Sequence, residues 1–159
     1  MDKDLRCDLT TVIALDLMDA LAGAMWRCKL WVLAVAVAAA AGARLTGELA
    51  ELAGALRDSC VEDTGVDAAL LDAVDDGAEL PQDGRFKCYL QCTMDAAGYM
   101  ADGNVDVDLM LDLLPPEIGD LVADTVRSCG THVGGDDCET AYLTQLCWQA
   151  NNKENYFLV

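Results

Sequence analysis

Apolar side chains recur every three or four residues along most of the chain after residue 44, which is the spacing of one face of an α-helix. Acidic and other polar residues occupy the faces between, and glycines and prolines separate the periodic segments. The pattern predicts six short helices, over about residues 45–60, 67–76, 83–97, 107–114, 116–129 and 138–150. No stretch alternates apolar and polar positions over strand length with turn signals beside it, so the predicted fold class is all-α.

The most apolar segment, Leu30–Gly42, indicates a secretory signal. A membrane-spanning helix takes about 20 residues, and this segment is too short. Arg27 and Lys29 precede it and a small-residue cleavage site follows, which is the order of a signal peptide. A buried alanine-rich helix is the alternative, but it does not explain why basic residues flank one end only. We therefore expect an upstream extension or wrongly assigned start over 1–24, a signal peptide over 25–43 and a secreted, extracellular domain over 44–159.

The composition adds a strong negative charge. Ten Lys+Arg against 28 Asp+Glu give a formal net charge of −18 at pH 7. This charge repels phosphate backbones and anionic headgroups, so nucleic acid and acidic membranes are poor candidate partners. Hydrophobic residues make up 53%, enough for a buried core, and a single histidine leaves few catalytic schemes.

Six cysteines fall within residues 44–159, at intervals of 27, 3, 36, 8 and 8 residues. An even number in a small secreted domain indicates disulfides, and six cysteines allow 15 pairings. Cys88 and Cys92 lie one turn apart on one helix face, so we expect each to bridge to a different helix. Zinc is disfavoured because only one such short pair exists and secretion argues against free thiolates. We expect no metal and no cofactor.

This cysteine spacing resembles that of the insect odorant-binding proteins, the pheromone/general odorant-binding (PBP/GOBP) family. The tail, with Cys147-Trp148 and then Tyr156–Val159, is similar to mosquito and fly members, as are the segments 56–60 and 87–92. The resemblance covers residues 45–159. It implies six helices around an internal apolar cavity, held by the disulfides Cys60–Cys92, Cys88–Cys138 and Cys129–Cys147.

The resemblance also implies a function. Family members carry small hydrophobic volatile ligands, odorants or pheromones, through aqueous sensillum lymph to odorant receptors, as monomers or weak homodimers. The inward stripes of the fourth and fifth predicted helices supply most candidate cavity residues, and the match of the tail adds two more. Plain core packing is the alternative role for each of them. The candidates are Val107, Met110, Leu114, Val122, Ala123, Val126, Trp148 and Phe157.

The C-terminal segment Asn151–Val159 has no helical periodicity and ends in apolar residues. In similar proteins this tail closes the cavity as a lid, and a basic side chain and a tyrosine hydroxyl hold its terminal carboxylate. The matching positions are Arg57, Tyr89 and Val159. Mosquito members have histidine where this chain has Arg57, and arginine stays charged at all relevant pH. We therefore expect the lid to loosen only well below neutral pH, as carboxylates become protonated.

An enzyme is not expected from this sequence. No G-x-S-x-G motif is present, and the single histidine, His132, lies in a loop rich in glycine and aspartate, where we expect it to be exposed. The acidic segment 102–108 fails as an EF-hand, because Val107 and Leu113 stand where that loop requires Gly and Glu. The alternative function is a secreted, disulfide-bonded helical module that binds lipid or protein with an external apolar surface. Saturable displacement of an apolar probe would distinguish a cavity from such a surface.

Overall fold

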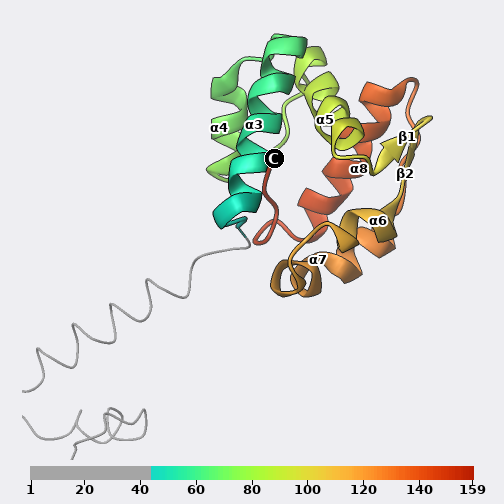
Figure 1. Ribbon diagram of the computed structural model, residues 1–159. Coiled ribbons are helices and arrows are strands. Elements are labelled where there is room, and N and C mark those ends of the chain that lie inside the picture. Colours follow the sequence, from blue (N-terminus) through green and yellow to red (C-terminus); the bar gives the residue numbers. More distant parts are fainter. Residues whose placement is uncertain (1–43) are drawn as a thin grey trace, which may run out of the picture. The chain divides into compact units, whose positions relative to one another are not determined.

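The computed structural model describes residues 44–159 and confirms the all-α prediction (Figure 1). The predicted extension over 1–24 and signal peptide over 25–43 lie outside the described residues. None of the described helices is both long and apolar enough to cross a membrane. The described chain contains six helices and one hairpin: α3 (Gly47–Thr64), α4 (Ala68–Asp75), α5 (Gly84–Ala96), β1 (Met100–Ala101), β2 (Asn104–Val105), α6 (Val107–Asp112), α7 (Pro116–Cys129) and α8 (Asp137–Asn151).

Aspartates begin four of these six helices. Asp67, Asp83, Asp106 and Asp136 stand at the N-caps of α4, α5, α6 and α8, and each side chain accepts a hydrogen bond from a backbone N–H in the first turn. A carboxylate at this position satisfies a free N–H and complements the positive end of the helix dipole. Part of the acidic excess therefore fixes where the helices begin.

Helix α3 continues one turn beyond its predicted end at residue 60. It stops at Gly65, which has φ 62° and donates its N–H to the carbonyl oxygen of Val61 at 2.9 Å. Glycine adopts this left-handed conformation without steric cost, so it is a common residue just after a helix. Helix α6, in contrast, is shorter than the predicted helix over 107–114, because it ends at Asp112.

The hairpin of β1 and β2 is the element that periodicity does not predict. The two antiparallel strands pair Met100 with Val105 and turn at Asp102 and Gly103, which have φ 51° and 70°. Two successive residues with positive φ make the turn that suits two-residue hairpins, and Asp-Gly is one of its preferred pairs. The Asp-Gly pair is therefore the sequence signal for this element.

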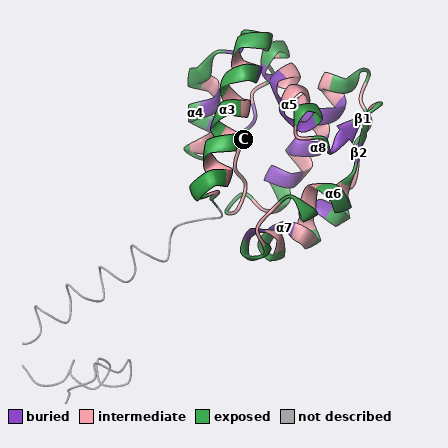
Figure 2. Cartoon of the chain, viewed as in Figure 1, coloured by how far each residue is buried: buried purple, intermediate pink, exposed green. Residues whose placement is uncertain are grey.

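The core lies between α5 and α8. Helix α5 packs most extensively against α8 and next against α3. Phe86 and Tyr89 of α5 have no exposed surface, and Tyr142 of α8 is 2% exposed. Figure 2 shows the buried residues concentrated on α5 and α8, whereas α3 is mostly exposed or intermediate and has one buried residue, Cys60.

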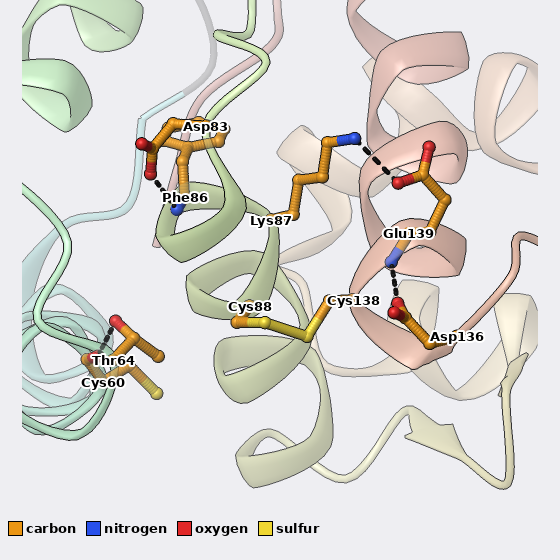
Figure 3. Close-up of a disulfide and its surroundings, with 9 residues drawn as sticks. All are labelled: Cys60, Thr64, Asp83, Phe86, Lys87, Cys88, Asp136, Cys138 and Glu139. Carbon is orange, nitrogen blue, oxygen red and sulfur yellow. Dashed lines mark hydrogen bonds and ion pairs between the residues drawn. A yellow bond between two sulfur atoms is a disulfide. The ribbon is translucent and has the colours of Figure 1, made fainter.

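Three disulfides connect the helices. They join α3 to α5, α5 to α8 and α7 to α8, and they are the pairs that the family resemblance implies: Cys60–Cys92, Cys88–Cys138 and Cys129–Cys147. Bridges that close loops of this length stabilise a fold by about 3–4 kcal/mol each, mainly by restricting the unfolded chain. Figure 3 shows Cys88–Cys138 with the ion pair of Lys87 and Glu139 beside it, at 2.7 Å. Helices α5 and α8 are therefore joined covalently and electrostatically.

Candidate functional site

One apolar cavity of about 280 Å³ lies between the helices. Its walls come from α3, α5, α6, α7, α8 and the C-terminal tail. No Asp, Glu, Lys, Arg or His side chain lines it, so the described wall offers apolar groups, a few neutral polar groups and the chain terminus. The lining residues are Leu45, Leu49, Leu52, Ala53, Leu56, Leu90, Thr93, Ala97, Tyr99, Met110, Leu113, Leu114, Val122, Thr125, Val126, Gln145, Trp148, Asn152, Asn155, Tyr156, Phe157, Leu158 and Val159.

The structure brings six of the eight candidate cavity residues to this wall: Met110, Leu114, Val122, Val126, Trp148 and Phe157. Val107 and Ala123 do not line it. Val107 begins α6 and packs half-buried against the core. Ala123 follows Val122 on α7, and one residue turns a helix by about 100°, so the two side chains point in different directions.

Helix α3 supplies one side of the cavity, although none of the eight candidate cavity residues lies on it. Leu49 and Leu56 line it together with their neighbours on the same stripe. The stripe is visible in the sequence, where it predicts a helix with an apolar face. A cavity wall and a packed core require the same residue types, so periodicity alone does not distinguish them.

The C-terminal tail follows α8 and ends among α3, α4 and α5 (Figure 1). The Tyr89 hydroxyl donates a hydrogen bond to the terminal Val159. The Leu158 N–H donates to the Asp75 carboxylate at 3.2 Å, and the Asn152 side chain donates to the Leu121 carbonyl at 2.9 Å. The tail is thus bound at three points while its last four residues line the cavity.

Arg57 does not contact the terminal carboxylate as the resemblance implied. Its guanidinium instead pairs with Asp75 at 3.0 Å and Asp72 at 2.9 Å, and no ion pair joins it to Val159 within the described chain. The two aspartates are three residues apart on one face of α4, so a planar guanidinium reaches both. Because Asp75 also accepts the Leu158 N–H, Arg57 acts on the tail through this carboxylate.

Three tyrosines near the tail remain protonated. Burial raises the pKa of Tyr89 to about 12, and the nearby Arg57 partly opposes this rise. Burial also raises the pKa values of Tyr99 and Tyr156 above the ordinary value of 10. Burial therefore penalises ionisation of these three hydroxyls.

Two buried donors have no hydrogen-bond partner in the described chain. They are the Trp148 indole N–H and the Tyr156 hydroxyl, and both side chains line the cavity. Trp148 is 5% exposed. Leaving a buried polar group without a hydrogen bond destabilises the fold by about 1–3 kcal/mol. A hydrogen bond from either donor to an acceptor on a ligand would therefore be favourable.

A group of Cys129, His132 and Cys147 has ligand atoms within 4.8 Å of one another. Both cysteines form the disulfide between α7 and α8, so neither offers a thiolate to a metal. His132 is exposed, as the sequence predicts.

Together these features define a disulfide-linked helical protein with an internal cavity suited to a small apolar molecule. The model of the PBP/GOBP family matches residues 42–151, and the chain belongs to this family. General odorant-binding protein 69a of Drosophila melanogaster is 37% identical over 98 residues, which are 61% of this chain and 66% of that protein. The match therefore spans just under two thirds of that relative.

Solved structures agree with this assignment. The medfly odorant-binding protein CcapOBP22/CcapOBP69a is 36% identical, with a TM-score of 0.57, over 64% of this chain and 88% of that one. Odorant-binding protein 4 of Chrysopa pallens is 25% identical, with a TM-score of 0.64, over 73% of this chain and all of that one. The recognition of the family from its cysteine spacing is confirmed.

Proposed function

We propose that the protein is a secreted, non-enzymatic carrier of small hydrophobic volatile ligands, which it holds in the 280 Å³ cavity and transports through aqueous lymph to receptors. The observation that carries this proposal is the apolar wall without a charged side chain. Its relatives are named for odorant binding, which supports the same ligand class. The ligands are odorants or pheromones.

Cavity size and chemistry bound the affinity. A cavity of about 150 Å³ accepts benzene, so a cavity of about 280 Å³ has room for a molecule roughly twice the size of benzene. A ligand that buries about 300 Å² of apolar surface gains about 7 kcal/mol before the costs of association. Because these costs reduce the net gain, we expect affinities near micromolar or weaker and broad selectivity.

The tail is the proposed lid of this cavity. Phe157 and Val159 line the wall, and the Tyr89 and Asp75 hydrogen bonds hold the end of the chain against α4 and α5. A ligand that enters or leaves on this side must displace these contacts. We infer that the closed tail lengthens the residence of the ligand during transport.

Displacement of the fluorescent probe N-phenyl-1-naphthylamine from the secreted, oxidised protein tests the carrier function. Leu114→Trp places a large ring in the cavity wall and should lower probe affinity at least tenfold. Val133→Trp is the matched control, because Val133 is 77% exposed and lies off the cavity wall. Equal binding by both variants, or binding to neutral vesicles without saturable displacement, would point to the external apolar surface instead.

A further inference from the structure

Two hydrogen-bond donors of the cavity wall have no partner in the described chain, whereas other polar side chains of the wall, such as Thr93 and Asn152, are hydrogen-bonded within it. The Trp148 N–H donates only, and it has no partner in the described chain. Gln145 lies three residues earlier on the same face of α8, is 8% exposed and lines the cavity, and its carboxamide can donate as well as accept. The Tyr156 hydroxyl faces the same cavity from the tail.

The described residues of the cavity wall provide no positive charge to accompany these donors. Among them the only ionic group is the terminal carboxylate of Val159, which is negative. Arg57, which acts on the tail through Asp75, is already paired with Asp72 and Asp75. A ligand carboxylate would therefore lose its hydration without gaining a cation, which is costly in a buried site. A neutral oxygen has a much smaller desolvation cost and can accept from one or two of the donors.

We propose that Trp148 and Gln145 recognise a neutral hydrogen-bond acceptor, so that the preferred ligands are ketones, aldehydes or esters rather than hydrocarbons or fatty-acid anions. This inference rests on the proposed carrier function and specifies its ligand class. The indole nitrogen has almost no accessible surface, so the ligand reaches it after a small turn of the ring. The raised pKa values of Tyr99 and Tyr156 agree with a site that disfavours anions.

Three ligands of nearly equal shape test this selectivity. They are 2-acetylnaphthalene, 2-isopropylnaphthalene and 2-naphthoate, which present a ketone, a hydrocarbon and a carboxylate on the same two rings. Trp148→Phe removes the N–H and keeps a ring, and Gln145→Met removes the carboxamide and keeps the length. Met110→Leu is the control, because it changes the cavity wall without changing a donor.

We expect each donor variant to weaken binding of the ketone about 3- to 10-fold, the value of one hydrogen bond, and to change binding of the hydrocarbon less than twofold. Met110→Leu should shift both ligands alike. In the wild type the carboxylate should bind at least tenfold more weakly than the ketone. Trp148 is the single tryptophan of residues 44–159, so its ¹⁵N-labelled indole resonance should move downfield with the ketone and not with the hydrocarbon.

Two results would overturn the inference. One is an equal loss of ketone and hydrocarbon binding in the donor variants, which would mean that Trp148 and Gln145 contribute only apolar contacts to the cavity wall. The other is carboxylate binding as tight as ketone binding. If none of the three ligands displaces the probe, the carrier function itself fails, which separates the two proposals. Mass spectrometry of the three disulfides confirms folding of each variant, and Gln145→Met keeps the test valid if Trp148→Phe does not fold.

Discussion

The contact of Tyr89 with the chain terminus gives a sharp test of the proposed lid. Tyr89→Phe removes the hydroxyl that donates to Val159 and leaves the buried ring in place. A hydrogen bond to a charged group contributes about 1.5–3 kcal/mol. The population of detached tails should therefore rise about 10- to 150-fold at neutral pH, since each 1.4 kcal/mol is a factor of ten. The lower part of this range is expected, because the Leu158–Asp75 hydrogen bond remains.

Carboxypeptidase digestion measures this population. The enzyme removes terminal residues only from a detached tail, so release of Val159 follows the open fraction when opening is fast. Dissociation of ligand, followed through Trp148 fluorescence in a stopped-flow instrument, should accelerate in parallel. Tyr142→Phe is the matched control, because its buried hydroxyl contacts Leu80 and Gln82 and not the tail. Equal release of Val159 from Tyr89→Phe and wild type would refute the lid contact, whatever the effect on overall stability.

Three further predictions concern pH and the disulfides. Burial raises the pKa of Tyr89 in the folded protein from 10 to about 12, so its contribution to stability is complete below pH 10 and is lost as the pH rises toward 12. Urea unfolding between pH 9 and 12 should show this loss of stability, and the loss should be smaller in Tyr89→Phe. Ligand affinity should stay within twofold between pH 7 and 6, because the single histidine, His132, is exposed, makes none of the described tail contacts and does not line the cavity. A steep drop in a displacement titration would contradict this. Replacing Cys129 and Cys147 with serine should lower the free energy of unfolding by about 3 kcal/mol in urea, and an unchanged midpoint would argue against the bridge.

The sequence predicts the helices well because their apolar stripes are regular. It places the cavity less well, since Leu49 and Leu56 show the same periodicity whether they face a core or a hollow. Val107 and Ala123 illustrate a second limit: in short helices, a small error in the phase of the stripe moves a side chain from the cavity to a neighbouring face. The family resemblance predicts that Trp148 and Phe157 line the cavity, because it compares this chain with folded relatives. Periodicity alone does not contain this information about the tertiary structure.

Arg57 illustrates the remaining limit. The resemblance identifies a basic position near the chain end, but the partner of that residue depends on which carboxylates α4 brings close to α3. Asp72 and Asp75 are nearer in the fold than the terminus, and both pair with Arg57. Nothing in the local sequence around residue 57 encodes this choice, because it depends on the packing of two helices and the path of the tail.

The exposure of α3 follows from the same arrangement and links stability to ligand binding. This helix has one fully buried residue, Cys60, whereas Leu49 and Leu56 line the cavity and Leu56 is only partly buried against the core. Its position depends on its packing against α5, on the Cys60–Cys92 bridge and on the ion pairs of Arg57. A ligand in the cavity adds apolar contacts to the leucines of α3, and a ligand that binds only the folded state stabilises it. The Cys60–Cys92 disulfide thus helps to stabilise a fold with a cavity inside, and a bound ligand fills the space that side chains leave empty.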